Sequence, residues 1–252
     1  MLQNSYKFLL IIILFIGSSS NRLNEEILYK KSLEGKSDLN NSKAVDFGEL
    51  VVETSWISKD KRNRDTFKAS EIDDKEWMDV YDNGIVKMTC LAPKSHRTEL
   101  KENAGVESSL NTFKKMEYTA TLKNIPYNGV TIAQIHNRGG VKRPWIRVYV
   151  DDDRHIKIKA TETTPDEKKS TYSTYVGPLY TAESEFSINI TTQNGLATFE
   201  IKNEGTSFSK TLSPSSDWNK YKNNYYLKAG VYTEGNDVEP ILEISAFSIL
   251  YK

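Results

Sequence analysis

Hydrophobic and polar residues alternate along most of the chain after residue 45. The clearest alternating runs are VKMTCLA at 86–92, MEYTATL at 116–122, WIRVYV at 145–150, HIKIKA at 155–160 and EISAFSILY at 243–251. The run FSINITTQNGLATFEIK at 186–202 also carries Asn194-Gly195 between its two halves, which predicts a tight hairpin. Such alternation indicates strands with one buried face, and no long helical period, repeat or glycine-rich phosphate loop interrupts it. We therefore expect an all-β fold, an antiparallel two-sheet β-sandwich of jelly-roll type.

Three further segments predict strands whose polar face is unusual. The segments are SHRTELKE, TIAQIH and YYLKAGVY. Within each segment the polar side chains occupy alternate positions and so share one face; they are Arg97, Glu99, Lys101, Gln134, His136, Tyr226, Lys228 and Tyr232. Each strand alone is compatible with an ordinary solvated sheet face. Together they combine an imidazole, an amide, two phenols and a guanidinium, whereas solvated faces mostly carry Lys, Glu, Ser and Thr. This combination favours a concave groove that binds a polar, anionic ligand.

The same three segments resemble the signature motifs of the family 7 polysaccharide lyases, the alginate lyases. The usual forms there are Arg-Ser/Thr-Glu-Leu/Val-Arg, Gln-Ile/Val-His and Tyr-Phe-Lys-Ala-Gly-x-Tyr-Asn-Gln, and the three segments occur in this order. The resemblance covers about residues 46–252 and implies a jelly-roll lyase domain over that range. It further implies a secreted enzyme that cleaves alginate by β-elimination without a metal or any other cofactor.

The resemblance assigns roles to individual residues. In β-elimination the proton at C5 of a uronate is removed and the glycosidic oxygen leaves from C4, so the carboxylate beside C5 must be neutralised. Arg97, Gln134 and His136 correspond to the residues that do this, and Tyr232 corresponds to the catalytic tyrosine. With mannuronate, Tyr232 serves as both base and acid; with guluronate, His136 is the base and Tyr232 the acid. The phenolate of Tyr232 needs nearby cations such as Arg97 or Lys228.

Other residues are expected to support the reacting group or to bind the substrate. On the three strands these are Glu99, Lys101, Tyr226 and Lys228. The basic segment HNRGGVKRPWIR at 136–147 adds Arg138, Lys142, Arg143 and Arg147, with Trp145 placed against a sugar ring. Two interpretations of that segment are open: a loop that binds carboxylates of the substrate, and a solvated basic hairpin.

Departures from the family pattern bear on the substrate. Lys101 replaces the second arginine, which exchanges a planar fork for a point charge. Thr233-Glu234 replaces Asn-Gln and adds a negative charge, while isoleucine in QIH is associated with guluronate preference in the family. We expect internal cuts in alginate with some preference for guluronate. The alternatives are a lyase of the same fold acting on another polyuronate such as glucuronan, and a non-catalytic carbohydrate-binding module; the pairing of His136 with Tyr232 argues against the module.

The remaining reactive residue types predict no metal site. Cys90 alternates with Val86 and Met88 and is expected in the core. Asp151-Asp152-Asp153 lies between two alternating runs and predicts a hairpin turn rather than a calcium site. His96 and His155 have no carboxylate or cysteine at metal-ligand spacing.

The N-terminus predicts export. Lys7 precedes the apolar run 8–16, and small residues follow at 17–20, which is the layout of a signal peptide over residues 1–20. The run is short for a membrane span, so we expect no stable membrane insertion after cleavage, and a retained anchor is the alternative. Residues 21–45 are a polar leader. With 34 basic and 34 acidic residues, the charge balance indicates neither a nucleic acid nor a membrane partner, and we expect a secreted monomer.

Overall fold

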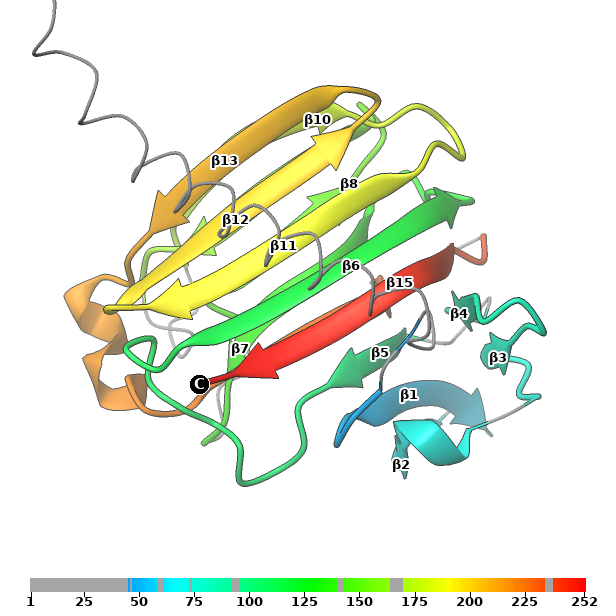
Figure 1. The fold of residues 1–252 in the computed structure, drawn as a ribbon, viewed down its shortest axis with the longest axis horizontal. Helices are drawn as coiled ribbons and strands as arrows, with labels where there is room; N and C mark the ends of the chain where they lie inside the picture. The colour runs from blue at the N-terminus through cyan, green and yellow to red at the C-terminus, as the bar shows by residue number, and fades with distance from the viewer. Residues whose placement is uncertain are drawn as a thin grey trace, which may run out of the picture. The chain divides into compact units, whose positions relative to one another are not determined.

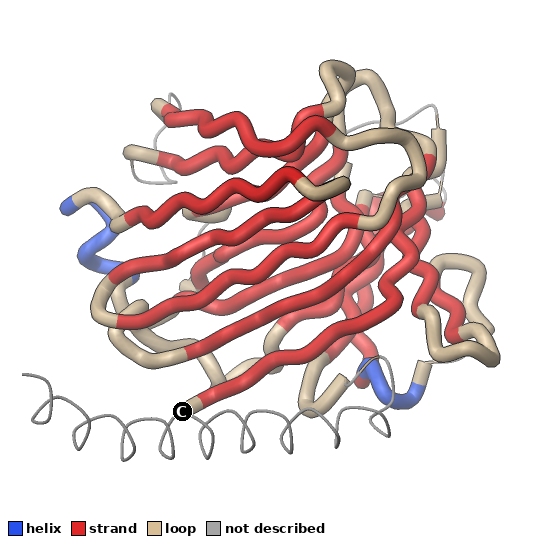
Figure 2. The backbone as a smooth tube through the Cα atoms, turned by 45° about the horizontal axis from the view of Figure 1, so that its top comes forward, coloured by secondary structure: helices blue, strands red, loops and turns tan. Residues whose placement is uncertain are grey.

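Two antiparallel sheets pack face to face in the computed structural model of the chain (Figures 1 and 2). The structure describes residues 45, 47–58, 61–72, 74–91, 96–139, 143–163, 170–233 and 238–252, without the side chains of 56–58 and 61–63. The predicted signal peptide, nearly all of the leader, Lys142 and Glu234 lie outside the described residues. None of the described helices is long and apolar enough to cross a membrane.

The first sheet has eight strands and the second has seven. The order in the first is β10-β9-β8-β7-β14-β5-β1-β2, and in the second β13-β12-β11-β6-β15-β4-β3. The strands are β1 (Val51–Ser58), β2 (Lys61–Lys68), β3 (Met78–Val80), β4 (Val86–Thr89), β5 (Arg97–Lys101), β6 (Lys114–Lys123), β7 (Val130–Asn137), β8 (Ile146–Val150), β9 (His155–Thr161), β10 (Tyr172–Leu179), β11 (Phe186–Gln193), β12 (Leu196–Asn203), β13 (Thr206–Leu212), β14 (Tyr225–Tyr232) and β15 (Ile241–Tyr251). Two short 3-10 helices, η2 (Ala69–Glu71) and η3 (Ser216–Tyr221), complete the described elements.

The predicted β-sandwich is confirmed, and the alternating runs coincide with strands. Asn194 and Gly195 form the turn between β11 and β12, with φ angles of 54° and 78°. Positive φ at both central positions is the requirement of a type I′ turn, which explains the Asn-Gly dipeptide. The residues at 151–153 lie in the turn between β8 and β9, as predicted.

The core lies between the sheets and is built by the apolar parity of each strand. In β7, Ile135 is fully buried, and in β9 Ile156 and Ile158 are buried with it. Ile132 of β7 is also buried although it has the opposite parity, and it lies where the register between β7 and β8 shifts, between Thr131 and Ala133. Cys90 is completely buried, which confirms its predicted place in the core. Burial of this kind contributes roughly 1.5–3 kcal/mol for each large aliphatic side chain, so the sandwich provides a firm base for the polar face of the first sheet.

Strand β14 carries the third motif and lies between the two strands that carry the others. It lies between β7 and β5, with Lys228 opposite both Gln134 and Lys101 and with Tyr232 opposite Arg97. Gly230 pairs with Glu99 and has a φ of +146°, and a Cβ there would lie 2.3 Å from the Thr98 carbonyl oxygen. The close approach of β14 to β5 therefore requires glycine.

Candidate active site

The site lies on the face of the eight-stranded sheet that points away from the core. Polar side chains of β5, β7 and β14 share this face, as their parity predicts, because Leu100, Ile135 and Leu227 of the opposite parity are buried in the core. The cross-strand registers then place Gln134 beside Lys228 and His136 beside Tyr226. The structure thus brings the four residues predicted to be catalytic together with the four supporting residues of the same strands, which are Glu99, Lys101, Tyr226 and Lys228.

Glu99 organises the middle of the face. Its carboxylate accepts hydrogen bonds from Gln134 Nε2 and Lys228 Nζ, and Arg97 Nη1 lies 3.5 Å from Oε2. Glu99 is 2% exposed and Lys228 is 1% exposed. Of the two roles predicted for these residues, burial favours support of the site over contact with the substrate. Glu99, which also binds Lys228, fixes the side-chain amide of Gln134 in one orientation.

Glu53 of β1 is a site residue that the sequence analysis did not identify. It accepts a hydrogen bond of 2.9 Å from Arg97 Nη1 and one from Lys101 Nζ, and Arg64 Nε lies 3.3 Å away. Burial alone would raise the pKa of this carboxyl, but Lys228, Lys101 and Arg97 together lower it to about 2. Glu53 is therefore ionised and fixes the position of Arg97. Nothing in the run VVETSW distinguishes this glutamate from one on an ordinary polar face.

His136 is held at one ring nitrogen and stacked on a tyrosine. Its Nδ1 lies 2.8 Å from the Asn137 backbone nitrogen and 3.0 Å from the Asn137 carbonyl oxygen, so this nitrogen has a backbone partner in either tautomer. The ring stacks on Tyr226 with centroids 5.4 Å apart. Burial lowers the pKa of His136 to about 4, and the positive charges of Lys228 and Arg97 act in the same direction. At neutral pH the imidazole is uncharged, as a general base must be, with Nε2 left for the ligand.

Tyr232 lies among three basic side chains. The guanidinium carbon of Arg97 is 4.8 Å from the ring centroid and that of Arg147 is 5.4 Å away. The His96 ring meets Tyr232 edge-on at 4.4 Å. The predicted proximity of Arg97 to this tyrosine is confirmed, and His96, which the sequence did not place at the site, is a further neighbour. Two guanidinium groups therefore lie within cation–π distance of the Tyr232 ring.

Three residues of the basic segment 136–147 lie in different surroundings. Arg138 stacks over Tyr226 at 4.6 Å and donates to the Glu102 carbonyl oxygen at 2.9 Å, so it joins the His136 end of the site. Arg143 instead donates to Ser170 Oγ and Tyr172 OH and contacts none of the other predicted site residues. The prediction for Trp145 is wrong: its side chain is 1% exposed and packs against Tyr225 in the core, so it offers no surface to a sugar.

The face has more basic than acidic groups, and one donor of the Arg97 guanidinium has no partner among the described residues. Arg97, Lys101, Lys228 and Arg147 surround the two carboxylates of Glu53 and Glu99. Arg97 Nε is buried and has no hydrogen-bond partner within the described part of the chain. A buried donor of this kind is costly unless a ligand accepts from it. A carboxylate of the substrate would satisfy it. No group of three His, Cys, Asp or Glu side chains suited to a metal ion occurs among the described residues.

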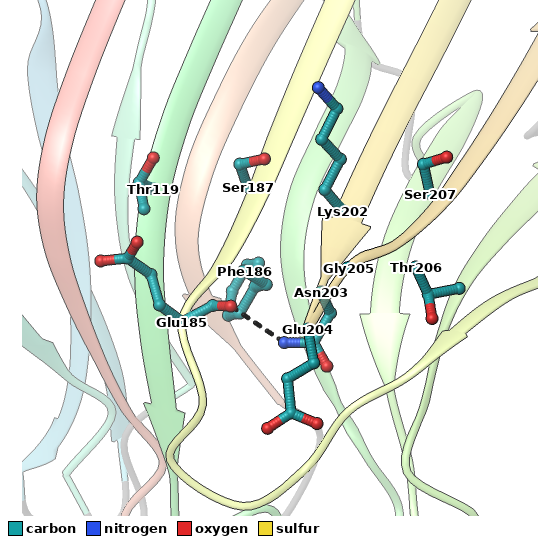
Figure 3. A pocket seen from close by; sticks show the side chains of 10 residues that line it. All are labelled: Thr119, Glu185, Phe186, Ser187, Lys202, Asn203, Glu204, Gly205, Thr206 and Ser207. Atoms are coloured by element: carbon teal, nitrogen blue, oxygen red, sulfur yellow. Dashed lines mark hydrogen bonds between the residues drawn. The ribbon is translucent and has the colours of Figure 1, made fainter.

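A hollow on the seven-stranded sheet is separate from this site (Figure 3). It has a volume of about 320 Å³ and is lined by Thr119, Glu185, Phe186, Ser187, Lys202, Asn203, Glu204, Gly205, Thr206 and Ser207. None of the predicted site residues lines it. Its Lys202 is exposed and provides a useful comparison for lysines on the other sheet.

The pKa of His136 leads to a pH prediction. Because the folded protein holds this pKa at about 4, compared with about 6.5 for a free imidazole, His136 should stay neutral until the pH falls towards 4. Activity that depends on the neutral base should therefore persist at about pH 5 and decline below it. Nuclear magnetic resonance titration of the three imidazoles, with His136→Asn to assign the signal, measures the midpoint directly. A midpoint near the free value would contradict this account of the base.

Solved structures share this fold. The alginate lyase from Klebsiella pneumoniae aligns with a TM-score of 0.64 at 15% identity over 84% of this chain and 98% of that one. Alginate lyase AlyC3 gives 0.63 at 15% identity over 81% and 90%, and A1-II′, a member of polysaccharide lyase family 7, gives 0.61 at 14% identity over 83% and 97%. The sandwich and its polar face thus define a polysaccharide lyase of the jelly-roll class.

The family model for alginate lyases matches residues 45–249. The chain belongs to this family, polysaccharide lyase family 7. A comparison with curated proteins gave no match.

Proposed function

We propose that this protein cleaves the 4-linked uronate chain of alginate by β-elimination on the face formed by β5, β7 and β14. One observation carries the proposal: a neutral imidazole, a tyrosine flanked by two guanidinium groups and an arginine whose buried Nε has no partner among the described residues share this face. Removal of a proton beside a carboxylate needs these three functions together: a base, an acid and a donor that neutralises the carboxylate.

The proposed reaction proceeds as follows. The uronate carboxylate accepts from Arg97 and from the Gln134 amide, which spreads the negative charge that develops when C5 loses its proton. The electron pair of the C5–H bond forms the C4–C5 double bond, and the C4–O bond breaks. The leaving oxygen takes a proton from the acid. Glu53 stays ionised. Glu53 and Glu99 lie beneath and hold the donors in place through hydrogen bonds, so little reorganisation is needed during the reaction.

The identity of the base depends on the sugar. In guluronate the C5 proton and the leaving oxygen lie on opposite sides, so His136 takes the proton and Tyr232 supplies one. In mannuronate they lie on the same side, and Tyr232 does both. The low pKa of His136 supports the first route, and Ile135 in QIH supports some preference for guluronate. Solved structures of similar lyases contain a GGG product in one case and dimannuronate in another, so both sugars belong in the test.

We also propose internal cutting by an exported monomer. The site lies on interior strands of the sheet, with β8, β9 and β10 on one side and β1 and β2 on the other, so a polymer can continue in both directions. Export rests on the signal-peptide pattern of residues 1–20. Product sizing during early turnover tests internal cutting, N-terminal sequencing of the exported protein tests export, and the molar mass in solution tests the monomer.

An absorbance assay for new C4–C5 double bonds tests the activity. Purified protein is incubated with polymannuronate, polyguluronate and glucuronan in parallel, with and without a chelator. Absorbance that grows on an alginate block in both conditions supports the proposal. Growth on glucuronan alone would move the activity to another polyuronate, and retained binding without absorbance on any polymer would indicate a non-catalytic module.

Arg97→Ala should lower kcat by about 10²- to 10³-fold, because it removes a donor that acts on the charge of the transition state. Steady-state kinetics on the preferred polymer measure the loss. Arg154→Ala, which changes an exposed arginine in the turn after β8, is the matched control and should leave kcat unchanged. An effect of Arg97→Ala on KM alone would make Arg97 a uniform binder instead.

A further inference from the structure

Two cations that lack a carboxylate partner within the described part of the chain face each other beside the site. Arg147 of β8 and Lys159 of β9 are direct cross-strand partners, and neither has a carboxylate partner among the described residues. Like charges directly opposite each other destabilise a sheet. The neighbouring Lys157 shows the usual solution, because it binds Asp151 at 2.9 Å and also Asp153. An unrelieved pair of cations on the face of the site indicates that an anion binds there.

The pair belongs to a row that crosses the sheet. Cross-strand registers connect Lys228, Gln134, Arg147, Lys159 and Thr174 in that order, from β14 at the centre to β10 at the edge. Because neighbouring strands lie about 4.8 Å apart, Lys159 lies about 10 Å from Gln134 along this row. The row is continuous with the reacting centre, since Arg147 also lies over the Tyr232 ring.

The outer end of the row carries an exposed aromatic ring. Lys159 Nζ lies 4.3 Å from the centroid of Tyr172, which is 40% exposed. The Tyr172 hydroxyl accepts a hydrogen bond of 2.6 Å from Arg143 Nη1. Arg143 therefore adds a third cation without a carboxylate partner in the described part of the chain, and it lies at the same edge.

We infer that Arg147, Lys159 and Arg143, with Tyr172 between the last two, bind successive carboxylates of the polymer on one side of the cleavage point. The inference rests on the proposed function and assigns one direction of the uronate chain to the β10 edge. A chain with a carboxylate on every sugar matches one cation on β8, one on β9 and a third, Arg143, beside Tyr172 of β10. The exposed ring of Tyr172 suits the apolar face of a sugar. Because basic and acidic residues balance over the whole protein, this row is a local basic feature and not part of a generally basic surface.

Lys159→Gln tests the row. On a long block of the preferred sugar it should raise KM about three- to fivefold with kcat unchanged, as expected for loss of one exposed ion pair. On the shortest oligosaccharide that is cleaved, the KM should equal that of the wild type, because this substrate does not reach β9. The difference on the long polymer should shrink in high salt. A purely structural role of Lys159 would show neither the length nor the salt dependence.

Three further variants complete the experiment. Lys159→Arg keeps the charge and should keep the wild-type KM, Arg143→Gln should repeat the effect of Lys159→Gln, and Lys202→Gln on the other sheet should have none. Equal KM values for Lys159→Gln and the wild type on the long polymer would overturn the inference. If the wild type cleaves no uronate polymer, the proposed function fails; calorimetric titration with polyguluronate and polymannuronate then decides the row separately. Binding weakened about fivefold by Lys159→Gln supports it, and equal or absent binding overturns it.

Discussion

Tyr232→Phe is expected to lower kcat at least about 10³-fold while alginate binding remains nearly unchanged. The substitution removes only the hydroxyl, so the ring keeps its contacts with His96, Arg97 and Arg147. The phenol is the proposed acid in either route, and a phenyl ring has no proton to give to the leaving oxygen. Stopped absorbance assays measure the rate, and calorimetry with the uncleaved polymer measures binding.

A matched variant separates this effect from a general loss of tyrosine hydroxyls. Tyr127→Phe changes a side chain that is 78% exposed and should leave kcat unchanged. Comparable turnover in Tyr232→Phe and the wild type would remove Tyr232 from the mechanism. Equal losses of binding and turnover would instead make it a substrate-binding residue.

Gly230→Ala should destabilise the fold by roughly 3 kcal/mol or more and abolish activity with it. A Cβ at this position would lie 2.3 Å from the Thr98 carbonyl oxygen and 2.6 Å from the Glu99 Cα, at a φ of +146° that other residues rarely adopt. Relief requires β14 to move away from β5, which breaks the alignment of Tyr232 with Arg97. Thermal unfolding should show Tm lower by about 6–12 °C.

Gly205→Ala is the control for backbone strain alone. Gly205 also has a positive φ, of +78°, but no atom lies within 4 Å of a Cβ built there. Its variant should lose about 1 kcal/mol and retain activity. If the two variants unfold at the same temperature, the contact between β14 and β5 does not limit stability.

The sandwich and the polar face are predictable from the sequence because both depend on local periodicity. Arg97 and Glu99 lie two residues apart, as do Gln134 and His136, and extended backbone forces each pair onto one face. The Asn194-Gly195 turn likewise follows from backbone angles that few other residues adopt. The assignment of roles to Arg97, Gln134, His136 and Tyr232 came from the family resemblance, and their chemistry remains a prediction.

Contacts between distant segments were beyond that reasoning. Glu53 reaches Arg97 only because β1 pairs with β5, and Arg147 reaches Tyr232 from a strand that is two places away. Alternation identifies the face of each strand but not its neighbours. The prediction for Trp145 was wrong for a related reason. This residue lies just before β8, where strand alternation does not determine the direction of a side chain, and its ring packs in the core.

The position of β14 also determines when the enzyme becomes complete. This strand ends at residue 232, yet it separates β7 from β5, so the eight-stranded sheet consists of two unconnected halves until β14 is inserted. Synthesis proceeds from the N-terminus, and closing such long loops is slow compared with forming hairpins. A growing chain that has reached residue 224 contains Arg97, Gln134 and His136 but lacks Tyr232 and the strand that aligns them. On the proposed roles, a chain that ends before β14 therefore lacks the complete site, which forms only when this late strand is inserted.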